Sequence, residues 1–312
     1  VYDDRGVTDE ATAIAEKIAA DDAVTAVVSC HLSSTVALAA CPAYQRAGIP
    51  ALSASSSHPD YAKIGDFVLR NNITDLPEVQ NNLQIAYNSG YRKIGIVAPK
   101  TDFGQSFTEN MIKSAEAVPG VEVVVTSFFL TETVDFSPNI TELLNADIDA
   151  ILCPAEYVQF APFAVQLRKV DENIPLMGAG TIYDPGLVEV GGAAVEGVRF
   201  PSLFNAHSAN PRGQDFTKAY GEKYDLTPNH ISVLVYDSTS AVINAIEVTG
   251  SDDRTGIKDS LHSTPYEGVT GTIIFNENNE CPKLQVVFEV QDGQFVEVPD
   301  MVQLWDDFVA GL

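Results

Sequence analysis

Basic residues are scarce in this sequence. Lysines and arginines number 18 against 43 aspartates and glutamates, which gives a formal net charge of −25 at pH 7. So negative a chain repels a phosphate backbone and anionic lipid headgroups alike. The shortage of positive charge therefore argues against binding to nucleic acid or to a membrane surface, and it is typical of an acidic, solvated surface that favours solubility.

Cysteine is scarce as well. The four cysteines include no C-x-x-C pair, so the sequence supports neither a zinc ribbon nor a thioredoxin-like site. Cys30 and Cys41 are close enough in sequence to form a disulfide bond, but Cys41 falls inside an expected helix. We therefore expect four buried thiols, at Cys30, Cys41, Cys153 and Cys281, with the bridge as the alternative.

Long apolar runs and enzyme motifs are missing too. No run approaches the roughly 18 apolar residues of a membrane-spanning helix. The sequence has no G-x-S-x-G elbow, no P-loop and no H-E-x-x-H, and the G-x-G at 178–180 lacks a third glycine. The five histidines lack the spacing of metal ligands. We expect no catalysis, no metal and no cofactor.

What the sequence does contain is an alternation of strands and helices. Its 312 residues, 45% of them hydrophobic, suffice for two domains of about 150 residues each. Apolar runs predict strands at 23–28, 49–52, 68–72, 93–98, 121–129, 150–153, 174–177 and 268–275. Helical periodicity predicts helices at 8–20, 34–47, 76–89, 107–117, 139–144, 160–170, 211–224, 229–249 and 256–263, a loop at 102–106, a hairpin at 284–298 and a tail helix from Met301. This order predicts an α/β fold with two parallel sheets flanked by helices.

Two loops rich in hydroxyl groups follow consecutive expected strands. His31-Leu32-Ser33-Ser34-Thr35 comes after the run at 23–28, and Ser53-Ala54-Ser55-Ser56-Ser57 comes after the run at 49–52. Open α/β sheets bind ligands at the carboxyl ends of their strands. Hydroxyls and free backbone N–H groups at helix N-termini suit a small carboxylate. Two such loops favour a ligand pocket, although capping of the following helices is the alternative role.

Short motifs along nearly the whole chain, taken in order, resemble the type I periplasmic solute-binding proteins of ABC transporters, specifically the leucine/isoleucine/valine-binding family. The motifs that carry the resemblance are Leu32-Ser33-Ser34-Thr35, Ala47-Gly48-Ile49-Pro50, Ser56-Ser57-His58-Pro59, Phe67-Val68-Leu69-Arg70, Asp102-Phe103-Gly104, Val134-Asp135-Phe136-Ser137, Ala194-Val195-Glu196-Gly197-Val198, Tyr236-Asp237, Gly268-Val269-Thr270-Gly271 and Asp292-Gly293. This family implies two Rossmann-like lobes joined by three crossings, with a ligand cleft between lobes that close around the solute.

The resemblance also implies domain limits. Lobe 1 would comprise residues 1–73 and 203–275, lobe 2 would comprise 74–202 and 276–299, and 300–312 would be a C-terminal tail helix. In the family, a first strand and helix precede the position of Val1. We expect the C-terminal segment, another chain or a rearrangement to cover the gap that their absence would leave in lobe 1.

Matching the family motif by motif assigns ligand-binding roles to residues of both lobes. Ser34 and Thr35 of the first loop and Ser55 and Ser57 of the second would bind the ligand carboxylate, with Ser57 in place of the family's threonine. In lobe 2, Tyr157 matches an aromatic residue that closes over the ligand. The remaining candidates are His31, Asp102, Phe103, Glu156, Thr181, Tyr183 and Asp184.

One feature of the family is missing from the matched positions. Amino-acid binders of this family usually place an acidic residue against the ligand ammonium, and here that position falls near Gly180. Either Asp184 or Glu156 supplies the counter-charge, or the ligand carries no ammonium, because a buried ammonium without a partner is costly.

The implied function is that of a periplasmic or extracellular binding protein, with a lipid anchor outside this sequence as one form. Such a protein delivers an amino acid or a related small carboxylate to a membrane permease. The alternatives are a sensory domain of the same fold in a signalling system, and a binder of a non-amino carboxylate or an amide.

Overall fold

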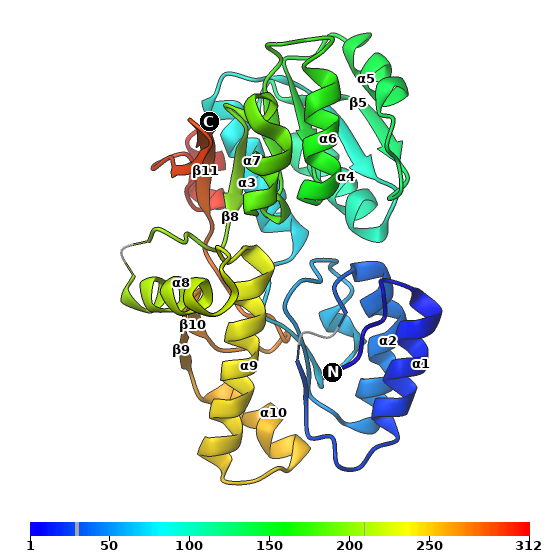
Figure 1. Ribbon diagram of the computed structural model, residues 1–312, viewed down its shortest axis with the longest axis vertical. Coiled ribbons are helices and arrows are strands. Elements are labelled where there is room, and N and C mark those ends of the chain that lie inside the picture. Colours follow the sequence, from blue (N-terminus) through cyan, green and yellow to red (C-terminus); the bar gives the residue numbers. More distant parts are fainter. Residues whose placement is uncertain (29–30, 209) are drawn as a thin grey trace. The chain divides into compact units, whose positions relative to one another are not determined.

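The structure is a computed structural model that describes residues 1–28, 31–208 and 210–312. It divides into two compact units, which are described separately (Figure 1). Unit 1 comprises Val1–Thr74 and Ala206–Leu284, and unit 2 comprises Asp75–Asn205 and Gln285–Leu312. The chain therefore passes from unit 1 back to unit 2 after Leu284, which is later than the predicted boundary at 275–276. The C-terminal tail belongs to unit 2.

Unit 1 contains a parallel sheet covered on both faces. Its strands are β1 (Val27–Val28), β2 (Ala51–Ser53) and β3 (Val68–Arg70), in that order. Ala51 and Val68 pack against α1 (Thr8–Ala19) and α2 (Ser34–Ala47). Leu52 and Leu69 pack against α9 (His230–Thr249) and α10 (Arg254–Ser263). Because neighbouring side chains in a strand point to opposite faces, these apolar strands are buried on both sides.

The remaining elements of unit 1 include a correction to the sequence analysis. They are η1 (Ala62–Ile64), α8 (Pro211–Tyr224), β9 (Tyr266–Gly268) and β10 (Gly271–Ile273). The single strand expected at 268–275 is wrong, because β9 and β10 form an antiparallel hairpin. The carboxylate of Asp237 accepts hydrogen bonds from the backbone N–H groups of Val269 and Thr270, each at 2.8 Å, and so holds the turn between the two strands.

Unit 2 is built on a seven-stranded sheet of order β12-β11-β8-β7-β6-β4-β5. The parallel strands are β4 (Lys93–Pro99), β5 (Glu122–Phe129), β6 (Ala150–Cys153), β7 (Leu176–Gly178) and β8 (Arg199–Ser202). The antiparallel hairpin β11 (Val286–Gln291) and β12 (Gln294–Glu297) extends one edge of the sheet. The expected α/β class with helix-flanked parallel strands is confirmed.

Helices cover both faces of this sheet (Figure 1). One face packs against α3 (Asp75–Asn88), α4 (Asp102–Ala115) and α11 (Trp305–Ala310). The other face carries α5 (Ser137–Leu144), α6 (Tyr157–Leu167) and α7 (Pro185–Gly191). The short helix η2 (Gly180–Ile182) precedes α7 in the chain, and η3 (Gly192–Val195) follows it. The loop expected at 102–106 is wrong, because Thr101 Oγ1 caps α4 by accepting from the Gly104 N–H at 3.2 Å, and the helix begins at Asp102.

The C-terminal tail packs within unit 2. Gln84 Nε2 donates to the Gln303 carbonyl at 3.1 Å, and the Gln303 N–H donates back to Gln84 Oε1 at 2.8 Å. The rings of Tyr87 and Phe308 meet edge to face, with centroids 5.6 Å apart. The tail therefore belongs to the core beside α3, which removes it from the expected candidates for covering lobe 1.

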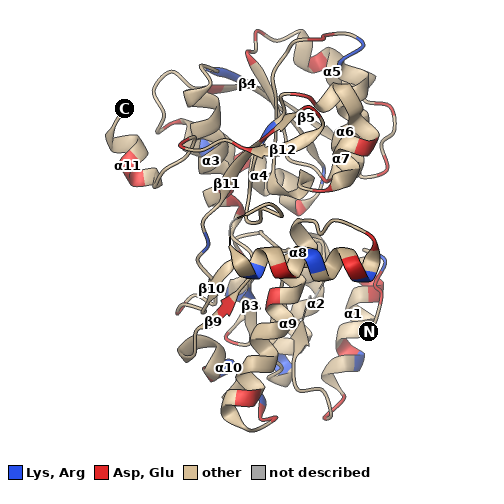
Figure 2. Ribbon diagram, turned by 60° about the vertical axis from the view of Figure 1, so that its left-hand side comes forward, with Lys and Arg blue, Asp and Glu red and all other residues tan. Residues whose placement is uncertain are grey.

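Three further expectations concern cysteines, hydropathy and charge. Cys41, Cys153 and Cys281 are buried thiols, and Cys30 lies outside the described residues. Within residues 1–28, 31–208 and 210–312, α9 is the one helix whose length and mean hydropathy of 1.3 would allow it to cross a membrane. Its Ala241 and Ala245 are packed in the core of unit 1. Acidic residues occur along the ribbon in both units (Figure 2).

Candidate functional site

In unit 1 the two hydroxyl-rich loops are bonded to each other, because they follow the neighbouring strands β1 and β2. Ser55 Oγ donates to the carbonyls of Leu32, at 2.8 Å, and His31, at 3.2 Å. Ser34 Oγ accepts from Ser56 Oγ at 3.2 Å. Both loops therefore form one surface of hydroxyls beside the first turn of α2, where the partial positive charge of the helix is greatest.

The serines of these two loops differ in the hydrogen bonds that their hydroxyl groups already make within the protein. The hydroxyl hydrogen of Ser55 is committed to backbone carbonyls, so this residue holds the loops together. No hydrogen bond joins Ser57 Oγ to another described residue, although the residue is only 6% exposed. Ser34 is also buried and uses its oxygen as an acceptor only. Thr35 is half-buried in the first turn of α2. Ser57 and Ser34 are thus the best-placed donors.

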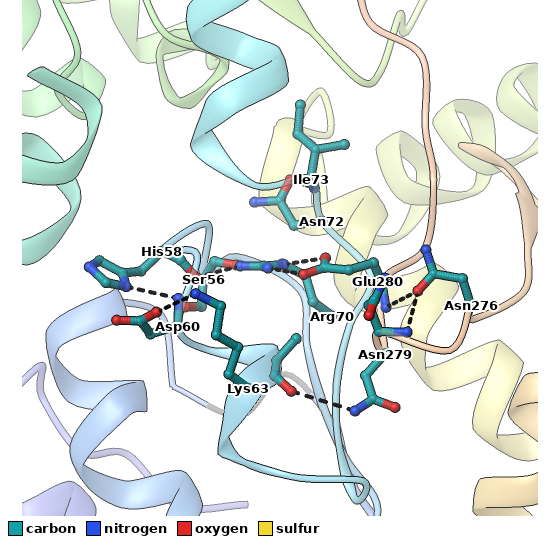
Figure 3. A network of polar contacts seen from close by, with 12 residues as sticks. Ser56, His58, Asp60, Lys63, Arg70, Asn72, Ile73, Asn276, Asn279 and Glu280 are labelled. Atoms are coloured by element: carbon teal, nitrogen blue, oxygen red, sulfur yellow. Dashed lines mark hydrogen bonds and ion pairs between the residues drawn. The ribbon is translucent and has the colours of Figure 1, made fainter. Parts of the chain in front are cut away.

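A buried arginine fixes the second loop (Figure 3). Arg70, at the end of β3, is fully buried, and its guanidinium donates to the carbonyls of Ser56 at 3.3 Å and His58 at 2.7 Å. It also pairs with Glu280, with Nε donating to Oε2 at 2.8 Å. Sequence reasoning missed Arg70 as a site residue. The available signal was a charged residue closing the apolar run Val68-Leu69.

His31 is engaged within unit 1. Its Nδ1 lies 2.6 Å from Asp4 Oδ2, its Nε2 lies 3.3 Å from Tyr44 Oη, and its backbone has φ +57°. Both ring nitrogens therefore have protein partners, and the residue shapes the first loop through its backbone carbonyl.

In unit 2, Tyr157 lies where the carboxyl ends of β6 and β7 open into loops. It is the first residue of α6 and is half-buried. A Cβ atom at Gly186 would lie 2.4 Å from its ring carbon Cε2, so the ring rests on the start of α7. Asp184 caps that helix by accepting from the Gly186 N–H at 2.8 Å. Thr181 Oγ1 donates to the Ala155 carbonyl at 2.8 Å, which joins the two loops.

A residue that the sequence analysis did not single out lies beside these loops. Glu78, in the first turn of α3, is only 6% exposed, and its Oε1 accepts from the Gly180 N–H at 2.5 Å and from Gln285 Nε2 at 3.4 Å. Burial raises the pKa of Glu78, its hydrogen bonds lower it and the charge of Asp75 raises it, and the net result is a pKa of about 7. A carboxylate therefore does lie at Gly180, supplied by another element.

Glu156 adds a second carboxyl group to this part of unit 2. It is the N-cap residue of α6, and its side chain is solvent-exposed. Although the residue is exposed, the protein around its carboxyl reduces hydration there and raises its pKa, and the negative charges of Asp184 and Glu78 act in the same direction. Asp184 and Glu78 are therefore each close enough to Glu156 to affect its ionisation.

Two of the other candidates, Tyr183 and Phe103, pack within unit 2, and the third, Asp102, begins a helix. Tyr183 is 2% exposed, and its ring lies in an aromatic cluster, 4.9 Å between centroids from Phe295 and 5.1 Å from Phe288. Asp102 is the first residue of α4. Phe103 packs against the core of unit 2 with its centroid 5.7 Å from that of Phe107. Within the described ranges, no group of three or more histidines, cysteines or acids has the arrangement of a metal site.

Hydroxyl-bearing and acidic strand-end loops on two α/β units define a solute-binding class of protein. A family model described as periplasmic binding protein matches residues 1–294. The chain belongs to this periplasmic binding protein family.

Known proteins agree with this assignment. The chain is 23% identical over 294 residues to the Leu/Ile/Val-binding protein homolog 1 of Brucella abortus (strain 2308), covering 91% of this chain and 76% of that protein. A leucine binding protein from Thermotoga maritima MSB8 is similar in structure, with a TM-score of 0.85, 26% identity, and coverage of 96% of this chain and 87% of the other. A solute binding protein from R. palustris in complex with benzoate has a TM-score of 0.89 at 18% identity, covering 95% and 83%, which shows a shared fold.

Proposed function

We propose that this chain is the substrate-binding protein of an ABC transporter and that it binds a small amino acid or a related carboxylate. The observation that carries the proposal is the Ser57 hydroxyl, a buried group that no hydrogen bond joins to another described residue, in the loop that follows the carboxyl end of the parallel strand β2. Together with Ser34 and the first turn of α2, it offers donors for a carboxylate.

Tyr157 of unit 2 supplies the apolar contact in this proposal. A tyrosine ring provides a large contact area and a hydroxyl at low entropic cost. A ligand that contacts both the serine loops and Tyr157 favours the arrangement of the two units in which both contacts are made, since a ligand shifts a protein towards the state that it binds better. Binding then requires no chemical step.

The cellular setting follows from the family and is part of the proposal. The chain would act in the periplasm or outside the cell, free or attached by a lipid anchor, and would deliver its ligand to the permease of the transporter. Binding of leucine and benzoate, named for similar proteins, gives the two ligand classes to test first.

A thermal-shift screen against amino acids and small carboxylates tests the proposal, because a ligand that binds only the folded protein raises its melting temperature by mass action. Ser57→Ala and Tyr157→Ala should each reduce the shift caused by the best ligand, with little change in the unliganded protein. Ser263→Ala and Tyr224→Ala, at exposed positions on α10 and α8, are the matched controls. Unaltered shifts in both test variants would remove these residues from the site.

A further inference from the structure

Glu78 is a buried carboxylate with no cation beside it. Both of its hydrogen bonds to described residues reach Oε1, from Gly180 and Gln285, and none reaches Oε2. No ion pair among the described residues includes Glu78. A buried ionised carboxylate is costly unless it is paired. One oxygen of this group is therefore left for a partner that the described chain does not provide.

The groups that face Glu78 are themselves acidic. Asp75, one turn earlier on α3, accepts hydrogen bonds from Ser106 Oγ at 2.5 Å and Asn110 Nδ2 at 3.1 Å, both of them neutral donors. Glu156, in the loop after β6, is near enough for the charge of Glu78 to raise its pKa, as the charge of Asp184 also does. The groups that shift the pKa of Glu78 include no lysine or arginine. Glu78 therefore has an acidic neighbour and no ion pair among the described residues, and a buried carboxylate in this position favours a cation.

The position of Glu78 connects this field to the ligand. Its hydrogen-bond partner Gly180 begins η2, two residues after the carboxyl end of β7, at the sheet edge where open α/β folds bind ligands. Tyr157, the proposed ligand contact, belongs to the same group of loops through Gly186 and Asp184. We propose that Glu78 is the residue of this chain that binds an ammonium group of the ligand, assisted by Glu156. This inference rests on the proposed function and selects amino acids over carboxylates that lack an amine.

Binding of pairs of ligands that differ only in the amine tests this inference. Leucine is compared with 4-methylpentanoate, and phenylalanine with 3-phenylpropanoate, with benzoate added, by thermal shift and titration calorimetry on the full chain. We expect the amino acid of at least one pair to bind at least about tenfold more tightly than its deaminated partner, which corresponds to about 1.4 kcal/mol. Equal or tighter binding of the deaminated partners would overturn the inference.

Glu78→Gln separates the charge of Glu78 from its shape, because the amide keeps an acceptor for the Gly180 N–H. We expect this variant to lose at least about tenfold in affinity for the amino acid and little in affinity for its deaminated partner. Glu156→Gln should lose less, because Glu156 is exposed to water. Glu172→Gln, at an exposed position in unit 2, is the control. Wild-type affinity in Glu78→Gln would overturn the assignment of Glu78.

The failures of this inference and of the proposed function are distinguishable. If deaminated carboxylates bind and amino acids do not, the proposed function stands and the Glu78 inference is wrong. If no member of any pair binds to the wild-type chain, the proposed function fails, and the inference fails with it.

Discussion

Arg70 and Glu280 form an ion pair between two segments of unit 1 that are 210 residues apart in sequence. The arginine side chain has no exposed surface, and the glutamate side chain is 22% exposed. The guanidinium uses its other donors on the carbonyls of Ser56 and His58. This one side chain therefore links the last crossing segment of unit 1 to the loop that carries Ser57 (Figure 3).

Breaking this pair should destabilise unit 1 and weaken ligand binding together. Glu280→Gln leaves the Arg70 charge buried without its counter-ion, at a cost of about 3 kcal/mol. We expect urea denaturation to show this loss of stability and calorimetry to show weaker ligand binding. In Arg70→Met/Glu280→Gln no buried charge is left, so the loss of stability should be smaller than the sum of the two single losses. Additive losses would contradict the pairing.

Gly186→Ala should act on the ligand through Tyr157. The added methyl group would lie 2.4 Å from Cε2 of the Tyr157 ring, which must move from its place on α7. We expect at least about a tenfold loss of ligand affinity, measured by calorimetry. Gly221→Ala in α8 is the control, because a Cβ atom there would meet its nearest neighbour, the Leu226 carbonyl oxygen, at 3.8 Å. Equal affinities in the two variants would show that the ring position is unimportant.

Glu78→Gln should change the pH dependence of stability. Burial raises the pKa of Glu78 to about 7 from 4.5. The folded state thus holds this proton more tightly than the unfolded state. The stabilisation that this bound proton gives to the folded state is complete below pH 4.5 and is lost as the pH rises to about 7. We expect the variant to be more stable than the wild type at about pH 8, by on the order of 3 kcal/mol, and no such gain at about pH 4. Denaturation at both pH values measures the difference.

His230 should limit the stability of unit 1 in acid. Burial lowers its pKa to about 4 from 6.5, and its Nδ1 has no hydrogen-bond partner in the part of the chain that the structure describes. The unfolded chain therefore takes up a proton below pH 6.5 that the folded chain resists, so stability falls from pH 6.5 towards pH 4. His230→Leu should flatten this fall in denaturation experiments. His207→Leu, at an exposed position, should leave it unchanged.

Local sequence signals determine much of the fold. The expected helix at 34–47 matches α2 at both ends, because serines precede it and Gly48, with φ +62°, ends it in the left-handed conformation. The apolar run at 93–98 likewise predicts β4 from the pattern of its own residues alone. Where one segment carries all the information, the sequence is sufficient.

Signals from distant residues are not visible in a local pattern. The residues at 268–275 have the composition of one strand, but Asp237, on α9, bends them into a hairpin. Glu78 looks like an acid that favours the first turn of a helix, and only the fold brings Gly180 to it. The serine loops are recognisable because each follows its own strand, whereas the contact between Glu78 and Gly180 joins residues that are 102 positions apart in sequence.

Gln285 connects the carboxyl group of Glu78 to the segment in which the backbone re-enters unit 2. Its Nε2 donates to Glu78, its Oε1 accepts from Asn81 Nδ2 at 2.8 Å, and it is the residue at which the backbone re-enters unit 2 after Leu284. Gln285 therefore bonds to two residues that lie one turn apart on α3, at the point where the backbone re-enters unit 2. A change in the ionisation of Glu78 would alter one of these two bonds, so we expect it to change how firmly this junction is held.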